Sequence, residues 1–241
     1  MDAVERPQSL LLGGRNVDYV LKRTRRRHGI AFTVDGNGLV VSAPWNASES
    51  RIHRAIVEAA DWIIRKLDEW ADYKARTQRW ADGEQLSYLG RDLTLTVLAD
   101  AILVPPVLLD QWRLQVTVAD PRSETRIREA AVSWYRRHAA VNFSGRVAHY
   151  ASAMGLPVPR MFLSNAQTQW GSCNAKRQIR LNWRLIQAPQ NVVDYVVVHE
   201  LAHIFEMNHS KRFWQIVAHH FPGHLQARKH LDQHGHWYLG I

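Results

Sequence analysis

The segment Asp194-Tyr-Val-Val-Val-His-Glu-Leu-Ala-His203 decides how the rest of this chain is interpreted. Apolar residues repeat around it at helical spacing, at Val193, Val196, Val197 and Leu201. This periodicity predicts a helix that packs in the protein interior. His199 and His203 are four residues apart, so both imidazoles lie on one face of that helix and can reach one metal ion. Glu200 is turned about 100° away from His199, so it can miss the metal and still reach a water beside it.

The spacing of His199, Glu200 and His203 matches the H-E-x-x-H pattern of zinc hydrolases. Zinc lowers the pKa of a bound water to about 7, and a neighbouring carboxylate can accept its proton. We therefore expect Zn²⁺ as the cofactor and Glu200 as the general base. A catalytic zinc usually takes three protein ligands. His209 is the strongest third ligand, and Asn208 is expected to supply the left-handed residue that ends the helix before it. The alternatives for the third ligand are Glu206, His219 and His220.

The distribution of helix and strand signals predicts an α+β fold. Strand patterns occupy 17–25, 29–34 and 38–42, and a helix is expected from Ser48 or Ser50 to Trp70. Strand patterns return over 85–118, and a long helix follows from Ser123 to near Gly155. Short strands are expected at 161–164 and 179–182. These signals predict a β-rich region with one long helix over 1–120, followed by a compact catalytic domain over 121–241, and we detect no internal sequence repeat.

The 241 residues carry a net charge of +9, and 46% of them are hydrophobic, as in ordinary globular proteins. A positive field attracts polyanions, and alternation would place Arg23, Arg25 and Arg27 on one strand face as a polyanion contact. A solvated sheet face is the plainer interpretation of these arginines. The single cysteine, the missing signal peptide and the absence of a long apolar run predict a cytoplasmic protein without a membrane contact.

Four segments occur in an order that resembles a known family: Gln169–Cys173, Ile179–Asn182, Asp194–His203 and Asn208–Trp214. Together they resemble the YgjP-like metallopeptidase family, which is related to the SprT-like and WLM groups. The resemblance is strongest over residues 160–235. It implies a compact zincin-type domain in which three histidines bind zinc, with His209 as the third.

Residues next to these motifs are candidates for substrate binding. Gly171 allows the backbone to approach the site closely, and Trp170 and Ser172 are expected to line the cleft beside an edge strand that pairs with extended substrate. Packing in the core is an equally good explanation for Trp170. Asn182 and Arg184 are expected to form hydrogen bonds around the site, with Arg184 stabilising an oxyanion.

These expectations leave three functions open. The first is a zinc-dependent peptidase that cleaves a peptide or protein substrate. The second is a metal-dependent hydrolase of nucleoside triphosphates, which the positive charge favours. The third is a nucleic-acid-binding module with structural zinc, although such sites are usually rich in cysteine and this chain has only Cys173. The three-histidine set favours zinc over the oxygen-bound magnesium of phosphoryl transfer.

Overall fold

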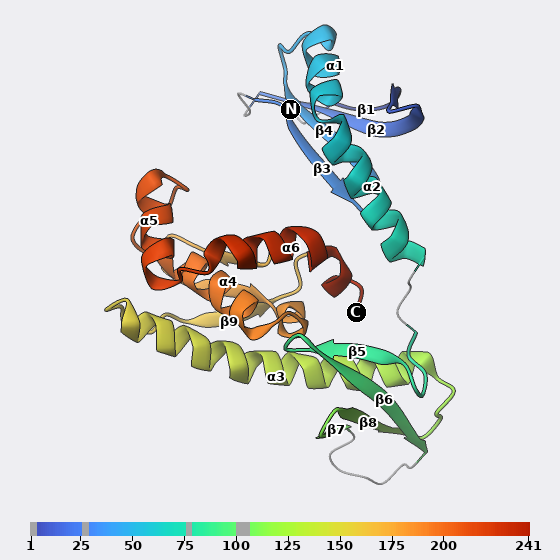
Figure 1. Cartoon of the computed structure of the whole chain (residues 1–241), viewed down its shortest axis with the longest axis vertical. Coiled ribbons are helices and arrows are strands. Elements are labelled where there is room, and N and C mark those ends of the chain that lie inside the picture. Colours follow the sequence, from blue (N-terminus) through green and yellow to red (C-terminus); the bar gives the residue numbers. More distant parts are fainter. Residues whose placement is uncertain (1–3, 26–28, 76–78, 100–106) are drawn as a thin grey trace. The chain divides into compact units, whose positions relative to one another are not determined.

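The computed structural model describes residues 4–25, 29–75, 79–99 and 107–241. It divides into two compact units, Met1–Thr77 and Gln78–Ile241, which are considered separately (Figure 1). Both units combine helices with mixed sheets, so the expected α+β class is confirmed.

The first unit is a four-stranded sheet with two helices. The strand order is β1 (Val4–Leu12), β2 (Arg15–Thr24), β4 (Gly38–Pro44) and β3 (Ala31–Asp35). Strands β2 and β4 are parallel, and the two outer pairs are antiparallel. Helices α1 (Glu49–Glu58) and α2 (Ala60–Ala75) contribute Ile52, Ile56 and Ile63 to a core shared with the sheet. Ala59 separates the two helices where the apolar spacing predicted one, and β1 was not predicted at all.

The arginines of the first unit differ from the expected pattern. Strand β2 ends at Thr24, so Arg25 lies beyond it, and Arg27 lies outside the described residues. Arg23 donates to the carbonyl oxygens of Ala47 at 2.6 Å and Trp45 at 3.2 Å, and the Arg25 guanidinium lies 5.9 Å from the Trp45 ring centroid. Part of this charge therefore stabilises the loop before α1, and polyanion contact by these arginines stays a prediction.

The second unit begins with a sheet of the same topology. Its order is β5 (Gln85–Tyr88), β6 (Arg91–Ala99), β8 (Arg113–Val118) and β7 (Val107–Asp110), again with a parallel central pair and antiparallel outer pairs. In both units the outer strands are hairpin partners and a helix follows the sheet. The structure thus contains a topological repeat that the amino-acid sequence does not reveal.

This second sheet belongs with the C-terminal half, whereas the sequence pattern placed the boundary near residue 120. Its core residues pack in one cluster with the helices that follow: Leu86, Leu93, Leu95, Leu114 and Val116. The turn between β5 and β6 also donates backbone hydrogen bonds from Leu89 to Ile186 and from Gly90 to Gln187. A side chain at Gly90 would lie 2.8 Å from the Pro189 Cα, so only glycine permits this contact. The division into units accordingly falls after Thr77.

The remaining elements surround one buried helix. They are α3 (Glu124–Ala153), β9 (Met161–Ser164), β10 (Gly171–Cys173), β11 (Ile179–Asn182), the 3-10 helix η1 (Trp183–Gln187), α4 (Gln190–Ala202), α5 (Lys211–His220) and α6 (His224–Tyr238). The third sheet has the order β10-β11-β9, which leaves β10 at an edge. Helix α4 contacts α3, α5, α6 and both β10 and β11, so nearly all of its side chains are buried (Figure 1).

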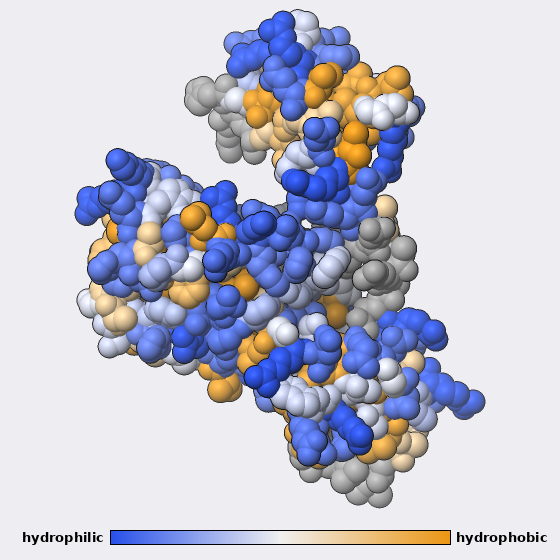
Figure 2. Space-filling view, in the orientation of Figure 1, coloured by the Kyte–Doolittle hydropathy of each residue, from blue (hydrophilic) through white to orange (hydrophobic). Residues whose placement is uncertain are grey.

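The surface over α6 is mainly hydrophilic, with isolated hydrophobic side chains (Figure 2). Helix α6 buries Ala227, Gly235 and Tyr238 and exposes most of its charged residues. Within the described residues, no helix has the length and hydrophobicity required to span a membrane.

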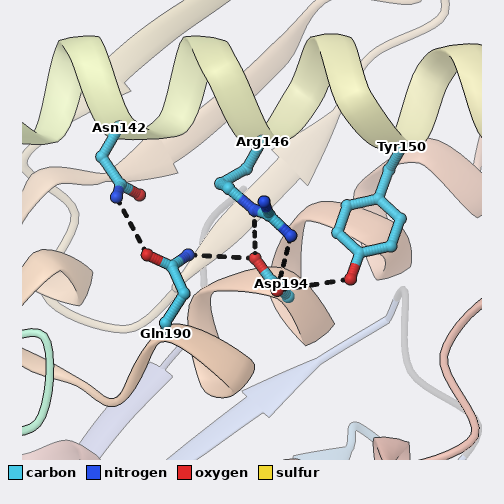
Figure 3. Close-up of polar contacts among 5 residues, drawn as sticks. All are labelled: Asn142, Arg146, Tyr150, Gln190 and Asp194. Carbon is cyan, nitrogen blue, oxygen red and sulfur yellow. Dashed lines mark hydrogen bonds and ion pairs between the residues drawn. The ribbon is translucent and has the colours of Figure 1, made fainter.

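A polar network fixes α4 against α3 (Figure 3). Asp194 accepts two hydrogen bonds from Arg146, at 2.6 Å and 2.8 Å, and one from Tyr150 at 3.3 Å. Gln190 donates to Asp194 at 3.0 Å and accepts from Asn142 at 2.9 Å. Two parallel bonds between a guanidinium and a carboxylate fix both position and orientation. The network therefore holds α4 one turn before His199.

We expect Arg146→Met to lower the free energy of unfolding by about 1–3 kcal/mol, because it leaves the buried Asp194 carboxylate without its charged donor. Arg136→Met is the matched control, since Arg136 is an exposed arginine of the same helix. Chemical denaturation of the three proteins measures the difference. Equal stability of Arg146→Met and the control would show that the network does not hold α4.

Candidate metal centre

The end of α4 opens into a cavity of about 480 Å³ in the second unit. His199 and Glu200 lie in the last turn of the helix, and His203 is its C-terminal cap. Glu200 is 5% exposed, whereas His203 is half-buried. The cavity brings these three side chains together with His209 and strand β10.

The three predicted histidine ligands converge in this cavity. One ring nitrogen from each of His199, His203 and His209 lies within 4.8 Å of the other two. The Nε2 atoms of His199 and His209 are 3.0 Å apart. Tetrahedral zinc with Zn–N distances of 2.0–2.1 Å would separate two ligand nitrogens by about 3.3 Å. Glu206, the alternative ligand, accepts a hydrogen bond from the Asn208 backbone at 3.4 Å and is outside the group.

The three candidate ligands His199, His203 and His209 are called the triad below. Helix α5 positions His209 and forms one wall of this triad. His209 directly precedes Ser210, whose hydroxyl accepts from the Phe213 backbone and caps α5. The fully buried Phe213 ring lies 4.6–4.9 Å, between ring centroids, from all three imidazoles. A rigid aromatic wall restricts the rotation of the three rings.

The expected left-handed turn at Asn208 is wrong. Helix α4 already ends at Ala202, and the chain leaves it through tight turns in which Ile204 donates to Leu201 and Phe205 donates to Ala202. Asn208 is not among the described residues with positive φ. The reversal is complete before Asn208, because the 3-10-like turns follow the cap directly.

Burial favours the uncharged form of two of the candidate ligand rings, His199 and His203. It lowers the pKa of His199 to about 3, with smaller contributions from His203, His209 and Arg228. Burial also lowers the pKa of His203. His203 Nδ1 donates to the Glu206 carbonyl at 3.1 Å, so its Nε2 carries the lone pair. Neutral imidazoles with a fixed tautomer are the form that binds metal ions.

Glu200 is packed tightly against strand β10. A Cβ at Gly171 would lie 2.5 Å from Glu200 Oε1 and 2.7 Å from its Cγ, which confirms that Gly171 permits a close backbone approach. Burial raises the pKa of Glu200 to about 8, and Oε2 has no hydrogen-bond partner among the described residues. A buried carboxylate without a partner is costly unless a cation lies nearby.

These observations fit a divalent metal held by His199, His203 and His209. The three rings lie close together, and the hydrogen bond of His203 Nδ1 leaves its Nε2 free to bind a metal ion. The unpartnered Glu200 carboxylate lies beside them and would be stabilised in its charged form by the cation. The donor set is complete for a site that keeps one position open.

The other predicted site residues divide into two pairs. Trp170 and Ser172 line the cavity, and Trp170 also packs on Gly235 and Tyr238. Asn182 and Arg184 do not line it. The Asn182 amide donates to the Ala166 and Gln169 carbonyls, and Arg184 donates to the Ile241 backbone oxygen and the Asn165 side chain. These buried contacts tie loops and the last residues together, so the structure gives no support to Arg184 as an oxyanion ligand.

Sequence reasoning missed several cavity residues, among them Tyr195, Met207, Arg228 and Asp232. Tyr195 precedes His199 by one helical turn and could have been found from that spacing. Arg228 and Asp232 lie on α6, four residues apart, and the Arg228 guanidinium lies 5.3 Å from the Trp214 ring centroid. No sequence motif connects α6 to α4, because only tertiary packing brings them together.

The triad predicts which histidines hold the metal. We expect His209→Ala to lose bound metal as completely as His203→Ala does, since each removes one of three ligands. His219→Ala should retain it, because His219 lies outside the triad. Elemental analysis of the purified proteins gives metal per chain. Full occupancy in His209→Ala would place the third ligand elsewhere.

We expect Gly171→Ala to destabilise the fold by about 1–3 kcal/mol, because the added methyl must displace Glu200. Gly145→Ala in α3 is the matched control: its Cβ meets nothing within 4 Å, so it should be stabilising by about 0.5–1 kcal/mol. Thermal unfolding distinguishes the two. A neutral effect of Gly171→Ala would show that the contact with Glu200 is loose.

Comparison with known proteins agrees with this geometry. A family model described as YgjP-like, metallopeptidase domain, matches residues 28–234. A UTP pyrophosphatase of Escherichia coli (strain K12) is 38% identical over 61 residues, which is 25% of this chain and 36% of that protein. The chain thus spans about a third of that curated relative, and no solved structure matches it. The match over most of its length shows that the chain belongs to the YgjP-like family of metallopeptidase domains and is a metal-dependent hydrolase.

Proposed function

We propose that this chain is a zinc-dependent peptidase of the zincin type, with His199, His203 and His209 as ligands and Glu200 as general base. The observation that carries the proposal is the position of strand β10. It is the edge strand of its sheet, lines the cavity along its whole length and lies directly against Glu200. A set of three imidazole ligands favours zinc over metals that prefer oxygen ligands.

An edge strand can bind an extended polypeptide through its free backbone groups. Strand β10 pairs with β11 on one side, through Gly171–Leu181, Ser172–Arg180 and Cys173–Ile179. Its other side pairs with no strand among the described residues and is available to a substrate strand. Such pairing would bring a substrate carbonyl beside Glu200, because Gly171 lies in contact with that carboxylate.

Glu200 moves the proton in the proposed reaction. When bound, the zinc polarises the scissile carbonyl and lowers the pKa of water. The Glu200 carboxylate accepts a proton from the attacking water and passes it to the departing amine nitrogen. A C–O bond forms as the C–N bond breaks. Burial of Glu200 suits the first transfer, because it raises the affinity of the carboxylate for a proton.

Arg228 is the one arginine in the cavity lining, and we propose that it stabilises negative charge on the reacting carbonyl oxygen. The Trp214 ring orients its guanidinium. Burial lowers the pKa of His199 and the Arg228 charge adds to that change, whereas burial raises the pKa of Tyr195 and the Arg228 charge opposes that rise. Arg228 thus takes the role that sequence reasoning gave to Arg184.

Hydrolysis of a nucleoside triphosphate is the second proposal, and the relative named UTP pyrophosphatase supports it. The cavity wall supports it less well. It contains one arginine together with two carboxylates, Glu200 and Asp232. Triphosphate recognition usually requires several cationic groups around the phosphates. The peptidase proposal therefore fits the cavity better.

We expect Glu200→Gln to hold zinc at wild-type occupancy and to lose peptide hydrolysis by at least about 100-fold, because the amide cannot accept the proton. Glu129→Gln, an exposed position on α3, is the matched control and should behave as wild type. Zinc content and turnover are measured on the same preparations. The substrates are an unstructured polypeptide and UTP.

This comparison tests both the role of Glu200 and the class of substrate. Near-normal turnover in zinc-loaded Glu200→Gln would eliminate Glu200 as the base. UTP hydrolysis without peptide hydrolysis, abolished by Glu200→Gln, would replace the peptidase proposal with the second one and retain the metal site.

A further inference from the structure

A second hollow lies next to the catalytic cavity, at the turn between β10 and β11. Its volume is about 300 Å³. Its wall consists of residues 156–160 before β9, residues 176–178 of the turn, and Ile204 after α4. We call it the hairpin groove. Two short stretches of chain run from the cavity to the groove. Cys173 lines the cavity, and Lys176, three residues later, lines the groove. His203 lines the cavity, and the next residue, Ile204, lines the groove.

The hairpin groove is cationic. Its lining includes Arg160, Lys176 and Arg177, all three exposed, and no acidic residue. None of these cations forms one of the ion pairs found among the described residues. The sequence shows the same imbalance, because residues 130–193 contain eight lysines and arginines and no aspartate or glutamate. The rest of the wall is largely apolar: Leu156, Pro157, Val158, Pro159 and Ile204.

The turn that carries two of the cations is well ordered. The Asn174 side-chain oxygen accepts hydrogen bonds from the backbone of Lys176 and of Gln178, each at 3.0 Å. Arg177 donates its backbone N–H to the Asn174 carbonyl at 2.8 Å. The Arg177 charge also reaches the cavity, because it opposes the rise in the pKa of Cys173 that burial causes. The cations are therefore held at the end of the strand that faces Glu200.

We propose that the hairpin groove is a subsite for an anionic group of the substrate, and that this anion is an acidic side chain of an extended polypeptide. The second half of this inference rests on the proposed peptidase function. An extended chain advances about 3.3 Å per residue. From Gly171, beside Glu200, the turn begins three residues later at Asn174, so a substrate running along β10 reaches the groove about 10 Å from the reacting bond. The subsite thus selects aspartate or glutamate three to four residues from the cleaved bond.

A phosphate group shares the same chemistry, and a nucleoside triphosphate is its other source. Lysine and arginine recognise carboxylates and phosphates through similar charge-assisted hydrogen bonds. The groove's apolar wall favours the polypeptide, since it gives the aliphatic part of a glutamate, or a neighbouring apolar residue, a surface to pack against.

The test measures binding apart from catalysis, in zinc-loaded Glu200→Gln protein. Fluorescent peptides of equal length carry either glutamate or glutamine at the third and fourth positions on both sides of a central dipeptide, and UTP is the third probe. The groove variants are Lys176→Gln/Arg177→Asn and, separately, Arg160→Gln. Asparagine suits position 177 because its φ of 57° lies in the left-handed region. Arg136→Gln on α3 is the control.

We expect the glutamate peptide to bind at least about tenfold more tightly than the glutamine peptide, and both groove variants to remove most of that difference. Arg136→Gln should preserve it. Added salt should weaken binding of the glutamate peptide selectively. Thermal unfolding of each variant confirms that it is folded, which these exposed positions favour.

If the groove variants weaken UTP binding and leave both peptides unchanged, the subsite recognises phosphate and the acidic-peptide assignment is wrong. Equal affinity of wild type and groove variants for all three probes would overturn the subsite itself. Neither result depends on turnover, so failure of the peptidase proposal in the hydrolysis assay remains distinguishable from failure of the subsite.

Discussion

The structure depends on how one buried helix accommodates two carboxylates. Asp194 and Glu200 both lie within α4, at 8% and 5% exposure. Asp194 is neutralised by Arg146 of α3, through two short hydrogen bonds. Glu200 has no ion pair among the described residues, and burial alone raises its pKa. A buried charge requires a counter-charge. A protein cation provides it for the first carboxylate, and under the proposed function a metal cation would provide it for the second. The Arg146–Asp194 pair orients α4. With α4 in this orientation, His199 and His203 lie beside Glu200, where a bound cation would stabilise its carboxylate.

The candidate metal centre has two parts, three side chains from one rigid helix and a fourth from a later segment of the chain. His199, Glu200 and His203 are fixed relative to one another by helical geometry, and α4 is fixed by its neighbours. His209 follows the chain reversal after α4, and its position is fixed by the neighbouring Ser210, which caps α5. Phe213 is the link between the parts, since its ring touches all three imidazoles while its backbone takes part in the cap. A single buried aromatic residue thus joins the third ligand to the other two. This arrangement explains how His209, ten residues after His199, reaches the other two histidines without the left-handed turn that we expected at Asn208.

The sequence correctly predicts the helices and strands that follow from local periodicity. It does not predict the features that depend on tertiary packing. The α4 helix, the long helix from Ser123 and the paired strands of the first unit follow from apolar spacing and turn residues. The boundary between the two units could not be predicted in this way, because the sheet of β5 to β8 is joined to the later helices by the contact of Gly90 with Pro189 and by a shared core. The H-E-x-x-H spacing located Glu200 and two histidines, and Gly171 was correctly assigned to a close approach. Arg184 was misjudged, since its proximity in sequence to the strand said nothing of its contact with Ile241. Arg228 was missed because α6 reaches the cavity only in the folded chain.

Two hollows of the second unit, the cavity and the hairpin groove, differ in charge. The cavity contains Glu200, Asp232 and Arg228, so it is nearly balanced and can accommodate an uncharged carbonyl and the polarity that develops on it. The surplus of cations lies beyond it, in the hairpin groove and along the acid-free stretch from residue 130 to residue 193. Placing a strong positive field directly beside the metal would weaken metal binding through like-charge repulsion. Two of the three cations of the hairpin groove lie instead at the turn after β10, where they can attract an anionic substrate segment. The proposed recognition of the anion thus lies in the hairpin groove and the proposed chemistry in the cavity, and strand β10, which borders the cavity and leads to the hairpin turn, connects them.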